Sequence, residues 1–374
     1  MTDFRNFIYR ISNSVEHKLD TLKLDFRKRM GWDTNVHICP YNSFGTSEVL
    51  YVKGRVLHDR GIQTSDNDEF WDNLVNMYKR FNSHEIKGAK LKISFQGIEK
   101  EIFTDEDGYF GDTLELNPDA VIPDLWCYPK LELISSPIPF DHHVEAKAGV
   151  MVPGPKSRFG IISDIDDTIL KTNAVNIARM VYHTFTNNAQ TRLAFPGVAA
   201  FYRALQDGGT GDENNPIFYV SSSPWNLYDL LIDFMKINGI PSGPVFLKDY
   251  GFTHNKIFTE SHNEHKTKKI RKVMNAYPLM QFILIGDSGQ EDPEIYSEII
   301  NEFPGRILAV YIRDVTSSSR DSEINITYKD HKVPFVYAEN SYSSAQHAAE
   351  NGFIKAEFLS EILKGKEKDE SLEE

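Results

Sequence analysis

Three carboxylates stand within four residues in the stretch IISDIDDTILKT, residues 161–172. Asp164, Asp166 and Asp167 follow a short apolar run that is typical of a buried strand. Like charges this close together repel one another and hold water, so the folding of a strand end does not explain them. A bound cation or a chemical reaction at this position would explain the three carboxylates.

Polar side chains end two further apolar runs. Ser221, Ser222 and Ser223 follow the run 217–220, and Asp287 follows the run 282–285, with Asp292 five residues later. In an open parallel sheet, ligands bind at the carboxyl ends of the strands. We therefore expect these side chains to converge with Asp164 and Asp166.

Two helix starts belong to the same set. A helix is expected to begin near Pro224, so that its first amides and the serine hydroxyls would receive a phosphate. Lys266 stands near the start of another helical pattern, where Lys268 and Lys269 compete for its role. The predicted site thus holds four acids, a serine and a lysine.

This set has a chemical logic. Grouped carboxylates need a cation, and their hard oxygen ligands suit Mg²⁺. One carboxylate can attack phosphorus and form an aspartyl-phosphate. A second carboxylate, two residues on, can protonate the leaving alcohol and then activate water. Serine and lysine can hold the phosphoryl oxygens, so the sequence predicts metal-assisted phosphoryl transfer.

Each residue alone has a simpler interpretation. A calcium loop beginning at Asp164 is excluded, because Ile169 and Val175 stand where glycine and glutamate are needed. Ser221 alone would be a helix cap, Lys266 a solvated lysine and Asp287 a cap of the next helix. Their occurrence in order, each at an expected strand or helix end, favours a site.

The chain divides into segments that differ in the spacing of their apolar residues. Residues 151–364 alternate short apolar runs with helical patterns, which predicts a mostly parallel sheet with helices on both faces. Residues 33–150 predict a small β-rich domain, and the two prolines and one glycine in 151–158 mark a linker. The expected elements of the β-rich domain are strands at 46–57, 89–95 and 128–134, a hairpin turning at Asp107-Gly108, and a helix around 70–81.

The two ends are charged. Within the segment 1–32, residues 3–30 carry apolar side chains at helical spacing, with seven Lys or Arg against four Asp or Glu. Such a helix either packs on its own protein or attaches to an anionic membrane surface. Residues 365–374 are a charged tail that we expect to be disordered.

Composition limits the class of protein. The chain has 374 residues, 40% hydrophobic and 25% charged, and a net charge of −13, which argues against nucleic-acid binding. Cys39 and Cys127 lack metal-type spacing, which fits a reducing compartment. Residues 1–13 lack the apolar core of a signal peptide. We expect a cytoplasmic protein, with peripheral membrane contact as an option.

The motifs DIDDT, VSSSP, HKTKK and GDSGQED, in this order, resemble those of the haloacid dehalogenase superfamily of phosphatases. SDIDDTI, FPGVAAFY, YVSSSPWNLYDLL, IGDSGQEDPEIY and YIRDV resemble the actin-patch-associated phosphatidate phosphatase family, in its bacterial type, over residues 150–352. The resemblance implies a Rossmann-like, haloacid-dehalogenase-type α/β domain preceded by a small, sandwich-like β-rich domain.

The resemblance also implies roles. Asp164 would be the nucleophile, Asp166 the general acid and base, and Ser221 and Lys266 the phosphate-binding residues. Mg²⁺ would be held by Asp164, the backbone of Asp166 and Asp287, with Asp292 supporting or bridging through water. Many superfamily members carry glycine where this chain has Asp167, which would orient the loop.

Several assignments stay open. Ser222 and Arg313 are candidate substrate contacts, and Arg313 equally suits a structural salt bridge. Residues 175–188 predict a helix that is either a lid or ordinary packing. Phosphatidate is implied as the substrate by resemblance alone. The alternatives are a soluble phosphomonoester and a lipid- or protein-binding scaffold without turnover.

Overall fold

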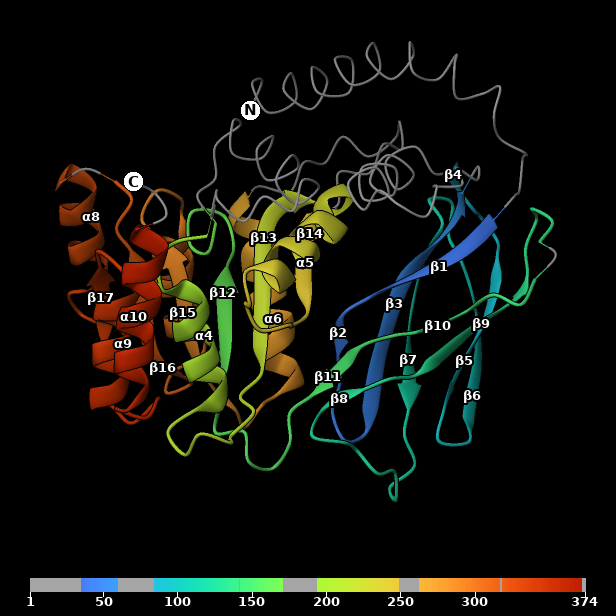
Figure 1. The fold of residues 1–374 in the computed structure, drawn as a ribbon, viewed down its shortest axis with the longest axis horizontal. Coiled ribbons are helices and arrows are strands. Elements are labelled where there is room, and N and C mark those ends of the chain that lie inside the picture. The colour runs from blue at the N-terminus through green and yellow to red at the C-terminus, as the bar shows by residue number, and fades with distance from the viewer. Residues whose placement is uncertain are drawn as a thin grey trace, which may run out of the picture.

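The computed structural model describes residues 35–59, 84–140, 142–170, 194–248, 262–316 and 318–371. A β-rich part lies beside an α/β part built on a six-stranded sheet (Figure 1). The helices expected within 1–32, 70–81 and 175–188 lie outside the described residues.

The six-stranded sheet has the order β14-β13-β12-β15-β16-β17, and every neighbouring pair is parallel. The chain fills one side of β12 first and then crosses to the other side, so the strand order reverses between β12 and β15. Such a reversal opens a crevice at the carboxyl ends of the strands. The strands are β12 (Phe159–Asp164), β13 (Ile217–Pro224), β14 (Val245–Lys248), β15 (Gln281–Asp287), β16 (Ile307–Arg313) and β17 (Phe335–Ala338).

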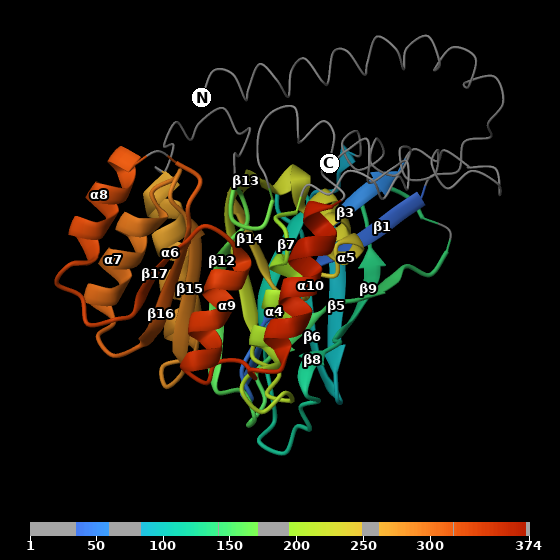
Figure 2. The ribbon, with the colours of Figure 1, turned by 60° about the vertical axis from the view of Figure 1, so that its left-hand side comes forward.

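Helices cover both faces of this sheet (Figure 2). One face carries α4 (Val198–Asp207), α5 (Tyr228–Ile237), α9 (Ser341–Glu350) and α10 (Phe358–Glu370). The other carries α6 (His262–Ala276), α7 (Asp292–Glu302) and α8 (Ser318–Tyr328). The α4 sequence shows why: Val198, Phe201, Tyr202 and Leu205 recur at helical spacing and are all buried. The predicted parallel sheet with helices on both faces is confirmed.

The expectation of a disordered tail is wrong for residues 365–370, because α10 continues through Glu370. Ile362 is fully buried on this helix, and Asp369 accepts a hydrogen bond from the Gly197 N–H at 3.1 Å. The charged residues thus belong to an amphipathic helix that docks beside α4, and composition alone did not reveal the docking face.

The β-rich part forms a common core between two antiparallel sheets. In the first sheet β3 pairs with β1, β4 and β7; the second has the order β10-β9-β5-β6. Their bounds are β1 (Asn35–Tyr41), β3 (Val49–Asp59), β4 (His84–Glu85), β5 (Lys90–Phe95), β6 (Ile98–Phe103), β7 (Tyr109–Glu115), β9 (Lys130–Ser135) and β10 (Glu145–Lys147). The strands predicted at 46–57, 89–95 and 128–134 correspond to β3, β5 and β9.

The hairpin turn was predicted at the wrong place. The hairpin joins β5 and β6 through Gln96-Gly97, where both residues have positive φ, as a tight hairpin turn requires. At Asp107-Gly108 the chain instead crosses between sheets, since β6 pairs with β5 and β7 pairs with β3. The Gly108 carbonyl accepts a hydrogen bond from the Val56 N–H, which ties this turn to β3.

A small third sheet joins the two parts. It has the order β2-β11-β8, from β2 (Ser43–Phe44), β11 (Val150–Val152) and β8 (Leu125–Cys127). Side chains alternate along β11: Val150 and Val152 enter the β-rich core, while Met151 packs into the core shared with the parallel sheet. Met151 and Val152 therefore close the β-rich part, and the predicted linker shortens to 153–158.

Further contacts tie the junction together. Tyr41 stacks on Trp225 with ring centroids 4.8 Å apart, and the Asn42 N–H donates to the Tyr228 hydroxyl at 2.6 Å. The Tyr277 hydroxyl donates to the Gly45 carbonyl at 2.8 Å. The parallel sheet thus has the β-rich part fixed against its β14 edge. No helix in the described part of the chain has the length and apolar character needed to cross a membrane.

We predict that Tyr277→Phe destabilises the chain by about 1–2 kcal/mol, because the buried Gly45 carbonyl loses its donor. Denaturant unfolding measures this change. Tyr128→Phe is the matched control, since Tyr128 is 57% exposed. Equal stability of both variants and the parent would show that this bond does not hold the junction.

Candidate active site

The turn after β12 places the first three carboxylates. The Ile165 carbonyl accepts hydrogen bonds from the N–H groups of Ile169 and Leu170, which folds the chain back on itself. Asp167 has φ 58°, a left-handed conformation that glycine, aspartate and asparagine adopt more readily than other residues. The Asp167 backbone therefore shapes the turn, as predicted for a position at which glycine is common.

The structure brings Asp164, Asp287 and Asp292 together. One carboxylate oxygen of each lies within 4.8 Å of the others, and all three residues are buried. Asp164 ends β12 and Asp287 ends β15, so they face each other across the reversal of strand order. Asp292 begins α7 directly afterwards.

Lys266 is the cation at this cluster. Its Nζ lies 2.7 Å from Asp164 Oδ1 and 2.6 Å from Asp292 Oδ1, and it is 3% exposed. Lys268, the competing candidate, is exposed on α6. The geometry therefore favours Lys266 as the lysine of the site.

The carboxylate oxygens differ in what they contact. Asp292 uses both, one for Lys266 and one for the Asp287 N–H at 3.2 Å. Asp287 Oδ1 accepts from the N–H groups of Gly289 and Gln290 at 2.7 and 2.9 Å. Asp164 Oδ2 and Asp287 Oδ2 accept no hydrogen bond from any residue that the structure describes. Two buried oxygens thus remain for a ligand.

Gly286 makes this approach possible. A Cβ atom on Gly286 would lie 2.5 Å from Asp292 Oδ2, far inside van der Waals contact. Only glycine lets the carboxylate of α7 reach the end of β15, which explains the Gly-Asp pair at that strand end.

The electrostatics follow from burial. Burial raises the pKa of Asp164, against the opposing effect of Lys266, and the neighbouring carboxylates raise it further. Burial and Asp292 raise the pKa of Asp287 to about 8. Burial lowers the pKa of Lys266, but Asp164 and Asp292 outweigh this effect and hold it above its ordinary value. If all three carboxyls were ionised, they would face one ammonium group with an excess of two negative charges, and the raised pKa values are the response to this excess.

This donor set fits a divalent cation. The negative charge of the ionised carboxylates would be balanced by a divalent cation, and carboxylate oxygens are the hard ligands that Mg²⁺ prefers. Among the described residues, Asp164 Oδ2 and Asp287 Oδ2 have no hydrogen-bond donor that would compete with the cation. Asp292, with both oxygens engaged, suits a supporting position. The Asp166 carbonyl, predicted as a ligand, accepts a hydrogen bond from Gln290 Nε2 at 3.0 Å and keeps a second lone pair.

The Asp166 carboxylate turns toward β13. Ser221 Oγ donates to Asp166 Oδ2 at 2.6 Å, and Ser223 Oγ donates to the same oxygen at 3.2 Å. Asp166 thus lies apart from the metal-type cluster, and the sequence grouped Ser223 with the other two serines without predicting its contact with Asp166. The alternation of a strand could have found it, since residues two apart share a face. Ser222 is half-buried between them and stays a predicted substrate contact.

The α-helix expected to begin near Pro224 begins four residues later, after a 3₁₀ turn. β13 runs through Ser221–Pro224, where Pro224 is the register partner of Lys248 on β14, and α5 begins only at Tyr228. A short 3₁₀ turn at Trp225–Leu227 separates the two. Pairing with β14 therefore extends the strand beyond the apolar run, and the serines are presented by a strand.

Gln290 is a residue that the sequence gave no reason to select. Its side chain donates to the Asp166 carbonyl, and its Oε1 accepts from Lys266 Nζ at 3.3 Å. It links the turn after β12 to the lysine of α6. Arg320 in turn donates to the Gln290 carbonyl at 3.2 Å and so supports the loop that carries it.

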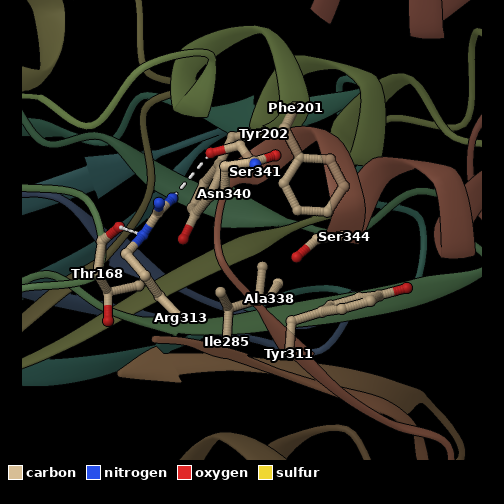
Figure 3. Close-up of a pocket in the computed structure, with 10 residues that line it drawn as sticks. All are labelled: Thr168, Phe201, Tyr202, Ile285, Tyr311, Arg313, Ala338, Asn340, Ser341 and Ser344. Carbon is tan, nitrogen blue, oxygen red and sulfur yellow. Dashed lines mark hydrogen bonds between the residues drawn. The ribbon is translucent and has the colours of Figure 1, made fainter. Parts of the chain in front are cut away.

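Arg313 lies behind the turn, in the pocket drawn in Figure 3. Its Nε donates to the Thr168 carbonyl at 3.1 Å and its Nη2 to Ser341 Oγ at 2.8 Å. The guanidinium lies 4.1 Å from the Phe195 ring centroid, and burial lowers its pKa to about 10. These contacts give Arg313 a structural role, but its partners are a carbonyl, a hydroxyl and an aromatic ring instead of the carboxylate of a salt bridge. Binding of substrate by Arg313 stays a prediction.

Comparison with known proteins finds a family match within the α/β part of the chain. Residues 159–314 match the family described as "Phosphatidate phosphatase APP1, catalytic domain". This match covers less than half of the chain, and it is a likeness of the α/β part to that family of catalytic domains. The matched segment runs from the first residue of β12 to just beyond the end of β16, and contains every site residue that the sequence predicted, from Asp164 to Arg313.

Two relatives align with this region. Phosphatidate phosphatase APP1 of Saccharomyces cerevisiae is 38% identical over 164 residues, which is 43% of this chain and 27% of the yeast protein. An uncharacterized protein of Schizosaccharomyces pombe is 27% identical over 191 residues, 51% of this chain and 31% of that protein. The chain therefore matches less than a third of the length of these relatives.

The similarity to solved structures is low. A carbohydrate acetylesterase from Xanthomonas citri covers 86% of this chain and 76% of its own, with 11% identity and a TM-score of 0.28. A TM-score this low does not indicate a common fold.

We predict that the metal-free chain loses stability as pH rises from about 4 to about 8. The folded chain keeps the Asp287 proton up to about pH 8, whereas the unfolded chain loses it near 3.8. Because the unfolded state then binds fewer protons, the free energy of unfolding falls with pH, by at most about 1.4 kcal/mol per unit.

Urea unfolding with a chelator, at a series of pH values, measures this slope. Asp287→Asn should flatten it, and added Mg²⁺ should raise the stability of the parent at pH 8. An unchanged slope in Asp287→Asn would show that this carboxyl ionises freely in the folded chain.

Proposed function

We propose that this protein is a Mg²⁺-dependent phosphomonoester hydrolase that acts through an aspartyl-phosphate, with phosphatidate as its substrate. The observation that carries the proposal is the cluster of three buried carboxylates around Lys266, with two carboxylate oxygens left without partners. The match to the APP1 catalytic domain supports the phosphatase class and the lipid substrate.

In the first step Asp164 is the nucleophile. Its carboxylate oxygen attacks phosphorus, a bond forms between them, and the bond from phosphorus to the alcohol oxygen of the substrate breaks. Asp166, whose carboxyl lies beside Ser221 and Ser223, gives a proton to that leaving oxygen as the general acid. The products of the step are the free alcohol and phosphorylated Asp164.

In the second step Asp166, now ionised, takes a proton from water. The water oxygen bonds to phosphorus, the bond from phosphorus to Asp164 breaks, and inorganic phosphate leaves. Lys266 stays charged throughout and stabilises the charge on the phosphoryl oxygens. Bound at Asp164 and Asp287 with Asp292 in support, Mg²⁺ would supply positive charge that neutralises the cluster and the phosphate.

We also infer a haloacid-dehalogenase-type fold for the α/β part. Its support is the position of the four motifs: DIDDT at the end of β12, VSSSP at the end of β13, HKTKK in α6 and GDSGQED between β15 and α7. Contact of residues 1–32 with a membrane surface is a further proposal, resting on the amphipathic pattern and basic charge of that segment.

We predict that Asp164→Asn lowers phosphate release by about 10³-fold or more, and Asp166→Asn by about 10²–10⁴-fold. Asp330→Asn, a change at an exposed aspartate in the loop between α8 and β17, is the control and should keep the parent rate. The assay measures phosphate released from dispersed phosphatidate and from an aryl phosphate, with Mg²⁺ and with chelator.

The outcomes separate the candidate functions. Chelator-sensitive release from phosphatidate supports a lipid phosphatase, whereas release from the aryl phosphate alone keeps the mechanism and replaces the lipid with a small ester. An Asp164→Asn variant as active as the parent would remove Asp164 as the nucleophile. Absence of release from both substrates would favour the scaffold alternative.

A further inference from the structure

A group of lysines lies at the junction of the β-rich part and the parallel sheet. Lys53 of β3 extends its Nζ over the Trp225 ring, 4.3 Å from the centroid, and lies 5.2 Å from that of Phe246. Lys272 of α6 places its Nζ 5.3 Å from the Tyr51 centroid and 5.7 Å from that of Phe44. Both parts of the molecule therefore contribute cations that lie over one group of aromatic rings, the aromatic floor, which consists of Phe44, Tyr51, Trp225 and Phe246.

These cations repel one another. Burial, together with the positive charges of Lys269 and Lys272, lowers the pKa of Lys53 to about 7. Among the residues that the structure describes, no carboxylate contacts the ammonium group of Lys53 or that of Lys272. The cation–π contacts with the aromatic faces compensate only part of this positive charge.

The group is open to solvent on one side. Lys53 and Lys269 are half-buried, and Lys272 is exposed. Lys266, Lys269 and Lys272 follow one another at steps of three along α6, a ridge that leads from the carboxylate cluster toward the β-rich part. Six residues of helix separate Lys266 from Lys272 by roughly 9 Å, so an ion at the junction would be distinct from one at Asp164.

We propose that Lys53, Lys269 and Lys272 form an anion site for a phosphate group, separate from the carboxylate cluster. The phosphate would be that of a lipid headgroup or a free phosphate ion, since both present the same oxygens. Its negative charge would relieve the repulsion among the three ammonium groups, and Trp225 would form the floor of the site. The site goes beyond the proposed reaction and does not require turnover.

Acylation of lysine amines, followed by mass spectrometry of peptides, tests the site directly. Only the neutral amine reacts, and a bound anion favours the ammonium form. If phosphate raises the pKa of Lys53 by one unit or more, its labelling at pH 7 slows about fivefold or more. Lys329 and Lys332, exposed near the β17 edge, are internal controls whose rates should not change.

The arms of this experiment separate the two sources of phosphate. All contain chelator, so that turnover does not change the ligand, and sodium chloride at equal ionic strength is the reference. Inorganic phosphate tests a free ion. Phosphatidylglycerol mixed into phosphatidylcholine vesicles tests a headgroup without a monoester, with pure phosphatidylcholine as its control. Protection of Lys53 in either arm supports the site and names its source; protection in neither overturns it.

A variant pair provides the second measurement. Lys53→Met with Lys272→Met removes two charges and keeps the side-chain stems on the aromatic floor; Lys329→Met with Lys332→Met removes the same charge elsewhere. Phosphate and vesicle binding, measured by calorimetry and co-sedimentation with chelator, should weaken about tenfold or more in the first variant only. Equal binding by both variants would show that the lysines only pack on aromatic rings.

Discussion

The structure depends on negative charge placed where water does not reach it. Asp164, Asp287 and Asp292 are each at most 1% exposed, and Lys266 is the cation that contacts the group. Burial raises the cost of every unbalanced charge, because the low dielectric of the interior strengthens repulsion. The ionised cluster therefore destabilises the folded chain unless it binds a cation or a proton. The same cation would take part in the proposed reaction, so the stability of the chain and its chemistry depend on the same carboxylates.

The fold supplies this arrangement through a few backbone features. The reversal of strand order sets the ends of β12 and β15 side by side, which brings two aspartates from distant parts of the sequence together. Gly286 admits Asp292, and the left-handed Asp167 turns the chain so that Asp166 faces β13 instead of the cluster. The β-rich part extends the same edge, because Tyr41 stacks on Trp225 just beyond the serines.

Much of the site could be predicted from sequence, because most site residues stand at the end of an apolar strand pattern or near the start of a helical pattern. Such patterns can be recognised from neighbouring residues alone. Asp164, Asp287 and Arg313 end their strands as expected, and Lys266 lies in the first turns of its helix. The errors have tertiary causes. Pairing with β14 kept Ser221–Pro224 extended, and docking beside α4 ordered α10 through Glu370. Gln290 acts through two long-range contacts that no periodicity encodes.

Titration of Mg²⁺ into the full chain, followed by calorimetry, tests most directly whether the buried carboxylates form a metal site. One ion should bind per chain, and Asp287→Asn should weaken binding about tenfold or more, because Asp287 Oδ2 is one of the two oxygens without a partner. Absence of binding, or equal binding by Asp287→Asn and the parent, would contradict the metal site and with it the proposed metal-assisted attack by Asp164.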